Sequence, residues 1–496
     1  MQDDYRVLRN LTLNAGLRFD HWNEKQFVRG CGATFDQASG KVLAGENKSG
    51  QVDLTCQPVG PFLGPATADL WIPASKAGVP QGLFKPSGYL SPRLGFAWRP
   101  MGGNGLVVRG AWGMFTSSYQ GNFTGSSIIG PPYWLSETIT FAKASLQRWE
   151  TAFPAEPHNF VAPSVVNAAY NTRPNKVEQW NLSVQKAIPI LRAALTVSYV
   201  GNRGYHLITK ESLNEVPPGA YTNLQAAKPY SRLGNVFVYQ NTGNSWYNSV
   251  QSVLERRFTN GLSYSLAWAF SRNIDDFQSA LGATQPTPFA PTGYNRGPSM
   301  LERRHILAFN GVYELPFGPG KRWGSHLPRV ANVLLGGWEL SSIYQFNSGQ
   351  PLVFLVPGAT LGNGYNTRPN LLGDPHLDQP GADRWFNPNY VDANGACHTV
   401  LAGLPCVLGV PKAYAFGNAG IGLVSGPSLH SLDSSLMKNF HFHERDYVQF
   451  RWESFNAFNE VNLGNPVTNI GQANTGAITG TAAGARQMQL ALKVVF

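Results

Sequence analysis

Charge is scarce in this 496-residue chain, and the sequence has no long hydrophobic run. Charged residues make up 14% of it, whereas roughly 25% is usual in soluble domains. No stretch approaches the about 18 consecutive apolar residues that a spanning helix needs. The first shortage argues against an ordinary soluble domain, and the second excludes a helical membrane protein.

Cysteine is also scarce, with four residues in the whole chain. Cys31 and Cys56 lie in one stretch rich in Gly and Pro, and Cys397 and Cys406 lie in another. His398 is the one histidine near either pair, and no zinc-ligand spacing is present. We therefore expect two loop disulfides formed in an oxidising compartment, and no metal site.

The sequence lacks the motifs of common catalytic sites. It has no Gly-x-Ser-x-Gly, no His-Glu-x-x-His and no phosphate-binding Gly-rich loop before a helix. Asp275 and Asp276 are interpreted as solvated loop carboxylates, and His441 and His443 as polar residues at a strand end. Residues 302–305 are interpreted as a charge cluster at a periplasmic rim. We expect no catalytic residues and no cofactor.

What the sequence does contain is clearest in its last ten residues, 487–496. Alternate residues of a strand point to opposite faces. One face here is mostly polar or small, and the other is apolar throughout. A soluble β-sandwich strand could share this pattern, but a bacterial outer-membrane barrel commonly ends on such a strand. We expect the barrel assembly machinery to read Leu492, Val494 and Phe496 as its C-terminal signal.

Similar strands recur along the chain, in segments of about ten residues, the length of a tilted strand in a bilayer. Asn260 and Gly261 separate two alternating runs and predict a hairpin turn. We expect roughly fourteen strands in all. The clearest are 11–19, 93–99, 106–115, 178–188, 193–200, 247–258, 262–270, 305–314, 337–347, 432–440, 447–456 and 487–496.

The connections between these strands alternate in length. The tight ones are 100–104, 188–191 and 259–261, and the long ones are roughly 23–88, 271–304 and 348–431. Short turns at one end and long loops at the other are typical of an outer-membrane barrel. The predicted fold is therefore all-β: an antiparallel transmembrane β-barrel, partial, with short periplasmic turns and long extracellular loops.

Polar residues on the second parity of the strands are predicted to face the lumen. Arg451 and Glu453 share a strand face, which a wet lumen tolerates but a dry sandwich core would not without close pairing. The solvent face of a sandwich is the alternative. The predicted lumen residues, which we expect to serve mainly in hydrogen bonds and salt bridges, are Arg18, Arg93, Arg109, Gln185, Gln345, Gln449, Arg451 and Glu453.

The aromatic residues and the net charge of +10 fit the same arrangement. Trp and Tyr favour the boundary between membrane and water. Lys and Arg are scattered along the chain without a basic run, so we expect no nucleic-acid partner but contacts with outer-membrane lipid and lipopolysaccharide. The aromatic residues on the apolar parity are Trp98, Trp112, Tyr199, Trp268, Phe270, Trp338, Tyr344, Phe346 and Trp452.

Several segments resemble a known family. Residues 2–20 resemble a barrel hairpin of TonB-dependent receptors, and 91–98 resemble the strand that follows it. Further segments are similar to the Oar-like subgroup of these receptors. They are 304–318, 336–343, 348–351, 368–370, 385–387, 416–418, 426–427, 451–459 and the terminal strand with Arg486.

The resemblance implies a plugged barrel of about 22 strands that imports a bulky extracellular ligand, such as a siderophore, oligosaccharide or peptide, across the bacterial outer membrane. Energy would come from the TonB complex through an N-terminal region. Such receptors carry a signal peptide, a carboxypeptidase-regulatory-like domain and a plug, none of which this sequence shows. We therefore expect residues 1–496 to be the C-terminal barrel portion.

Two other functions remain open from the sequence. A non-transport adhesin or secretion scaffold would share the barrel without needing a plug. A soluble, secreted glycan-binding β-sandwich would need an acid/base carboxylate pair if it cleaved its ligand, and no pair is singled out.

Overall fold

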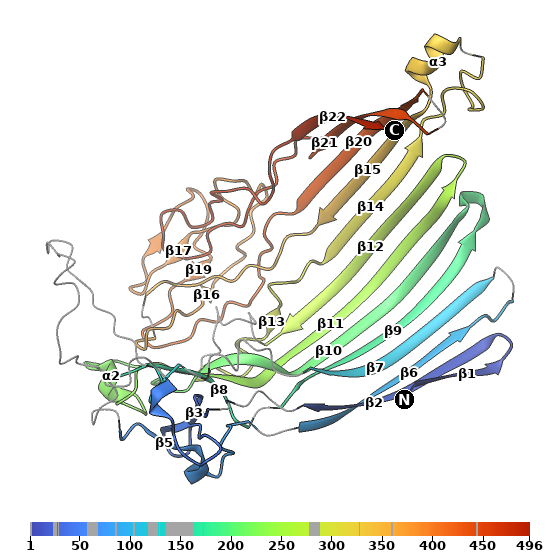
Figure 1. Ribbon diagram of the computed structural model, residues 1–496. Coiled ribbons are helices and arrows are strands. Elements are labelled where there is room, and N and C mark those ends of the chain that lie inside the picture. Colours follow the sequence, from blue (N-terminus) through green and yellow to red (C-terminus); the bar gives the residue numbers. More distant parts are fainter. Residues whose placement is uncertain are drawn as a thin grey trace.

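The computed structural model describes residues 2–22, 27, 29–56, 68–84, 87–102, 105–117, 127, 129–134, 162–171, 173–276, 288–326, 328–358, 361–442 and 445–496. Within these residues the fold is dominated by one 15-stranded sheet (Figure 1). Its main path runs through β1 (Gln2–Leu8), β2 (Leu11–Trp22), β6 (Ser87–Trp98), β7 (Leu106–Ser117), β9 (Asn175–Ile188), β10 (Ala193–Ser212), β11 (Val236–Thr259), β12 (Leu262–Asp275), β14 (His305–Glu314), β15 (Trp338–Asn347), β20 (Leu429–His441), β21 (Tyr447–Phe455) and β22 (Gln487–Val495).

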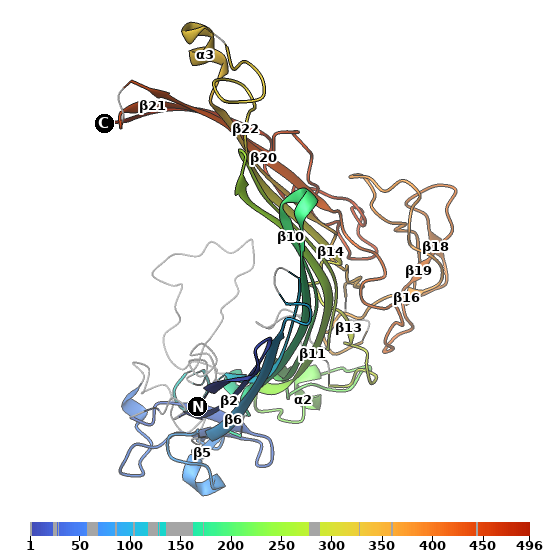
Figure 2. The same cartoon turned by 90° about the vertical axis from the view of Figure 1, so that its right-hand side faces the viewer.

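Every step along this path is antiparallel, and the strands form a single curved layer (Figure 2). The predicted antiparallel outer-membrane barrel sheet is therefore confirmed. A sandwich would need a second sheet packed over the first about 10 Å away. Among the described residues, the small sheet that contacts the large one meets it only at β8 and at β11.

The register joins the alternating patterns of the separate strands into two continuous faces. Leu94 lies opposite Trp112, Leu266 lies opposite Phe309, and further apolar pairs follow on the later strands. Because residues i and i+2 share a face, each pair fixes the face of its whole strand. All nine aromatic residues named above fall on this apolar face, which is the one that suits lipid.

The tight turns gather at one end of the strands (Figure 1). Asn260 and Gly261 have φ of 54° and 74°, the left-handed values that a two-residue type I′ hairpin requires at both central positions. Residues 189–191 form a short 3₁₀ turn. Of the predicted turn 100–104, residues 103 and 104 lie outside the described residues. One connection at this end is long: residues 315–337, between β14 and β15, which carry α3 (Arg329–Leu335).

The long connections at the other end contain short strands and small buried cores of their own. A three-stranded sheet packs against β8 and the extended part of β11 around buried Phe35, Val165 and Val236. A second small core contains Phe354 and Phe386. The elements of this end are β3 (Ala33–Asp36), β4 (Lys41–Ala44), η1 (Leu54–Cys56), β5 (Trp71–Pro73), η4 (Ala74–Ala77), β8 (Val165–Ala168), α2 (Leu224–Ala227), β13 (Gly297–Pro298), β16 (Asn370–Leu371), β17 (Tyr390–Val391), β18 (Cys397–His398) and β19 (Leu408–Gly409).

The large sheet is open. In the part of the chain that the structure describes, β1 pairs with β2 alone and β22 pairs with β21 alone. Each of these two strands therefore presents one unpaired edge, which a closed barrel would have to cover.

None of the helices formed by the described residues has the length and apolar character needed to cross a membrane.

Candidate ligand path and extracellular mouth

The eight predicted lumen residues share one face of the sheet. Arg93 and Ala97 are four residues apart on β6 and so share a face, and Ala97 lies opposite Arg109 of β7. Arg93 and Arg109 are therefore on the same face. At the far side of the sheet, Ser435 lies opposite Glu453. The pairs between the intervening strands continue the same face from β2 to β21. The residues on this face, opposite the aromatic residues, include Arg18, Arg93, Arg109, Gln185, Gln345, Gln449, Arg451 and Glu453.

Three of the eight form one hydrogen-bonded network on β21. The Arg451 guanidinium donates to Gln449 Oε1 at 3.0 Å and to Glu453 Oε1 at 3.4 Å. Gln449 Nε2 donates to Asn439 Oδ1 at 2.9 Å, and Gln489 donates to the Glu453 carboxylate. The network crosses β20, β21 and β22, so these side chains hold three strands together as well as lining a polar surface.

Two other pairs lie elsewhere on this face. Arg109 Nη1 donates to Gln185 Oε1 at 3.2 Å, which brings two predicted residues together. Arg18 Nε lies 2.7 Å from Asp20 Oδ1 and forms an ion pair. Arg18 is exposed whereas Asp20 is largely buried, so this pair fixes the direction of the Arg18 side chain.

The remaining two residues stand apart from those groups. The Arg93 guanidinium carbon lies 4.7 Å from the centroid of the Phe115 ring, a cation–π distance. Gln345 lies opposite Ala308 and Ser431, near the end of β15 that leads into the long loop. The structure thus brings five of the eight into direct contacts with one another and leaves three in separate places along the face.

A polar cavity of about 390 Å³ opens at the loop end of this face. Arg303, Asn347, Gln350 and Asn465 line it, and the rest of its wall is formed by Ser348, Pro427, Leu429, Leu463, Gly464 and Ala482. Asn347 has the parity of Gln345, so the cavity continues the polar face beyond the strands. We name it the mouth cavity. It combines one guanidinium with several amide groups.

Arg303 is held in place at the wall of the mouth cavity. Its Nη1 donates to the Glu302 carbonyl oxygen at 2.9 Å, and its Nη2 donates to Gln350 Oε1 at 3.0 Å. Residues 302–305 were predicted to lie at a periplasmic rim, and that prediction is wrong. They lead from a long loop into β14 and so lie at the opposite end from the tight turns. The direction of entry into the strand is the signal that could have placed them.

The loop beside the cavity is fixed by close backbone contacts between the segments that resemble the Oar-like subgroup. A Cβ on Gly349 would lie 1.6 Å from the Gly426 carbonyl oxygen, and one on Gly417 would lie 2.0 Å from that of Arg368. The Trp385 indole donates to the Ser425 carbonyl oxygen at 2.7 Å. These segments therefore form a scaffold for the loop, and Ser348, Gln350 and Pro427 within them also line the mouth cavity.

A buried acid joins two of the extracellular loops. Glu215, from the loop between β10 and β11, accepts a hydrogen bond from the Tyr365 hydroxyl, which belongs to residues 348–428. Asn363 Nδ2 donates to the Val216 carbonyl oxygen at 3.1 Å beside it. Burial raises the pKa of Glu215 to about 7, although the hydrogen bonds of Tyr365 and Ser212 oppose the shift.

The other acidic and histidine motifs have structural partners. The Asp276 carboxylate accepts hydrogen bonds from the Asn244 backbone N–H at 2.7 Å and from Asn244 Nδ2 at 2.8 Å, which joins the loop ends of β11 and β12. Asp275 is buried. Its interpretation as a solvated loop carboxylate was therefore wrong. His441 packs against Tyr447, with 5.1 Å between ring centroids, and His443 lies outside the described residues.

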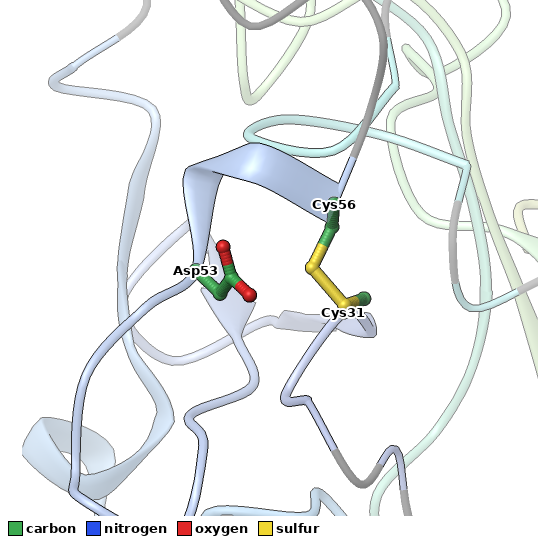
Figure 3. A group of neighbouring side chains, drawn as sticks. All are labelled: Cys31, Asp53 and Cys56. Atoms are coloured by element: carbon green, nitrogen blue, oxygen red, sulfur yellow. A yellow bond between two sulfur atoms is a disulfide. The ribbon is translucent and has the colours of Figure 1, made fainter.

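Both cysteine pairs are disulfide-bonded in the structure, Cys31 to Cys56 and Cys397 to Cys406. Asp53 lies beside the first pair (Figure 3), and the three residues are close enough to suggest a metal site. The sulfurs are bonded to each other, however, and thiolate is the form that binds a metal. Hydrogen bonds from Thr55 and Arg29 lower the pKa of Asp53 and occupy its carboxylate. The disulfide and these hydrogen bonds therefore serve to hold the loop together.

The chain belongs to the outer membrane beta barrel domain family, whose model matches residues 1–489. It is accordingly an outer-membrane protein. A comparison with curated proteins found no match.

Solved structures with a similar arrangement of strands include three outer-membrane proteins. The outer membrane transporter YddB from Escherichia coli aligns with a TM-score of 0.45 and 8% identity, over 82% of this chain and 40% of that one. The siderophore receptor PirA from Acinetobacter baumannii gives 0.43 and 10%, over 100% and 45%. The ferripyoverdine receptor of Pseudomonas aeruginosa gives 0.42 and 8%, over 99% and 37%. The chain thus spans less than half the length of each.

Proposed function

We propose that this chain is the barrel portion of a TonB-dependent receptor of the Oar-like type, which imports a bulky ligand across the outer membrane. The observation that carries the proposal is the face of polar and small residues, whose parity is continuous across all thirteen strands of the path and which ends in the mouth cavity. A structural barrel would need a water-compatible lumen but no fixed binding groups at its entrance.

The mouth cavity suits a ligand rich in oxygen acceptors. Arg303 provides a permanent positive charge because an arginine keeps its proton at physiological pH. The amide side chains around it can donate as well as accept hydrogen bonds. Carboxylate, hydroxamate and hydroxyl oxygens are the matching groups, and siderophores, oligosaccharides and peptides all present some of them.

Transport would then proceed from the folded loops to the polar face. The loops hold the cavity open in advance, so little ordering is needed when the ligand binds. Side chains such as Gln449 and Arg451 offer hydrogen bonds that a passing ligand can exchange one at a time. The energy would come from the inner membrane through TonB and an N-terminal plug, and insertion would use the barrel assembly machinery.

An uptake assay in paired strains tests the function. The full gene is expressed in bacteria with and without TonB, and accumulation of ⁵⁵Fe-loaded siderophores, ¹⁴C-labelled maltooligosaccharides and labelled peptides is measured. We expect one class to accumulate when both the gene and TonB are present. Accumulation that persists without TonB, or no accumulation of any class, would overturn the proposal.

The same assay tests the mouth cavity. Arg303→Ala removes the fixed charge, and we expect the apparent affinity for the transported class to fall about tenfold, as for loss of one charged hydrogen bond of about 1.4 kcal/mol. Arg257→Ala, which removes an exposed arginine at the tight-turn end of β11, is the matched control and should leave affinity unchanged. Equal losses in both variants would contradict a ligand role for Arg303.

A non-transport adhesin or secretion scaffold is the second candidate, and the folded extracellular loops favour it. The small cores around Val165 and Phe386 give these loops a stable outer surface. Such a protein would bind cells or partners at the surface with no TonB-dependent accumulation in the uptake assay.

A further inference from the structure

The connection between β14 and β15 breaks the pattern of tight turns at its end of the sheet. Residues 315–337 contain α3 (Arg329–Leu335), which lies beyond the strand ends and on the convex side of the sheet (Figures 1 and 2). A hairpin needs only two to five residues to reverse direction. The extra length therefore serves something other than strand reversal.

The helix leaves an apolar face uncovered. Val330, Val333 and Leu334 have the i, i+3, i+4 spacing that puts side chains on one face. Their exposed fractions are 75%, 47% and 62%, and the helix has no buried residue. Earlier in the connection, Phe317 and Trp323 pack together with 5.5 Å between ring centroids and are also exposed.

This apolar surface continues the lipid-facing side of the barrel. Trp338, the first residue of β15, belongs to the aromatic face, and its indole N–H donates to the Leu334 carbonyl oxygen at 2.8 Å. Lys438, opposite Trp338, places its ammonium 5.5 Å from a Trp338 ring and donates to the Gly336 carbonyl oxygen. Contacts from two strands thus tie the end of α3 to the edge of the lipid-facing band.

The charge of the connection has one sign. Residues 315–337 contain Lys321, Arg322 and Arg329 and no Asp or Glu. Lys321 forms an ion pair with Glu314 at the end of β14, so Arg322 and Arg329 are the cations that can meet a lipid headgroup. The Arg322 guanidinium carbon lies 5.4 Å from the Trp323 ring, so a cation and an aromatic ring stand together. Apolar residues beside cations, with Trp at the boundary, are typical of segments that lie in the headgroup region of an anionic membrane.

From this geometry we infer that the connection between β14 and β15 is a membrane anchor, through residues 315–326 and 328–337. The apolar face of α3 lies in the periplasmic leaflet of the outer membrane, and Arg322 and Arg329 bind phospholipid phosphates, whereas the Lys321 ammonium is paired with Glu314. The occupant of the exposed face is lipid and not a second protein. The anchor holds the barrel at a fixed depth and rotation at its periplasmic end, independently of any transported ligand.

Depth-dependent fluorescence quenching tests the anchor. The full-length protein carries Val333→Cys labelled with a nitrobenzoxadiazole dye, and it is reconstituted in vesicles of phosphatidylcholine and phosphatidylglycerol. The native cysteines are bonded in pairs, so the new thiol labels alone. We expect quenching by lipids with a shallow doxyl group and little quenching by aqueous iodide. A label at Arg9→Cys, in the tight turn before β2, is the matched control and should respond to iodide.

Two results would overturn the inference. Quenching of the Val333 label by iodide and not by doxyl lipid would place α3 in water. Protection from both quenchers would mean that protein covers the face, either a partner or a second copy. The double variant Arg322→Gln, Arg329→Gln tests the charges separately and keeps the Lys321–Glu314 ion pair. Adding phosphatidylglycerol should increase doxyl quenching in the wild type and not in this variant, and an equal increase in both would exclude the phosphate contacts.

Discussion

Among single residues, glycines at close backbone approaches determine the shape of the extracellular loop. Gly349 and Gly426 come from segments almost 80 positions apart, yet one lies against the carbonyl oxygen of the other. A methyl group cannot fit at 1.6 Å from a backbone atom, and backbone cannot rotate away as a side-chain end can. Glycine is required at Gly349 for space.

Gly349→Ala should therefore loosen the loop of residues 348–428. We expect a loss of about 1–3 kcal/mol in its local stability, the usual range for overpacking, seen as faster proteolysis of the loop in the folded barrel. Gly381→Ala is the control in the same loop, because a Cβ there meets nothing within 4 Å. Unchanged proteolysis of Gly349→Ala would show that the two segments do not approach so closely.

The buried acid Glu215 makes the contact between two loops sensitive to pH. Its pKa rises from 4.5 to about 7 in the folded protein. Between these values the folded state keeps a proton that the opened loop releases, so the loop contact is full below about pH 4.5 and weakens as pH rises through about 7.

Hydrogen exchange of the amides near Val216 and Tyr365, corrected for the intrinsic effect of pH, measures this contact. We expect protection to fall about 70-fold, or about 2.5 kcal/mol, between pH 5 and pH 8. Glu215→Gln should hold protection high and constant over this range. Asp69→Asn, which removes an exposed carboxylate paired with Arg232, should keep the wild-type slope. A flat wild-type profile would mean that Glu215 is solvated.

For the strands, parity assigns each side chain to lipid or to the polar face, and chemical labelling checks that assignment. Single cysteines at Gln345 and Gln449 should react with a membrane-impermeant maleimide in intact outer membranes, whereas cysteines at Leu266 and Trp268 should not. Labelling after denaturation gives the total thiol in each variant. Free labelling at Leu266 and Trp268, with protection at the two glutamines, would invert the proposed faces.

The strands that cross the membrane could be predicted from sequence because each carries its own alternating pattern. Residues 305–314, for example, were predicted as a strand and form β14 with the same bounds. The extensions of β10 and β11 beyond residues 200 and 247 were missed, since residues such as Asn202, Arg203 and Lys210 break the alternation there. A paired strand outside the membrane needs no lipid-facing side.

The folded loops could not be predicted because long-range contacts stabilise their short strands. The Thr34 hydroxyl donates to the Ala168 carbonyl oxygen at 2.7 Å, across 134 residues of sequence. No local sequence pattern predicts a contact between residues so far apart in the chain. The same applies to the mouth cavity, whose walls come from Arg303, Gln350 and Asn465 on three separate loops. The polar parity of the strands was readable from the sequence, whereas the meeting of these loops was not.

In the molecule as a whole, the terminal strand lies at an edge of the sheet and presents its apolar side chains. Phe496 is 98% exposed, and Leu492 and Val494 are also exposed. Unpaired backbone groups beside an apolar row form a template for pairing with another strand. This arrangement supports the proposal that the barrel assembly machinery recognises the C-terminus.

Phe496→Ala should reduce the amount of protein in the outer membrane several-fold, because the assembly signal loses its aromatic end. Val495→Ala, one residue earlier and on the opposite parity, is the control and should assemble normally. Quantitative blotting of outer-membrane fractions gives the measurement. Equal amounts of both variants and wild type would exclude Phe496 from the signal.

The directions of the two edge strands limit how many strands a closed barrel can contain. Twelve antiparallel steps separate β1 from β22, and an even number of reversals leaves the two strands pointing in the same direction. Joining them directly would create a parallel pair. Closure by antiparallel pairing alone needs an odd number of additional strands, and the total is then even, as in bacterial single-chain barrels.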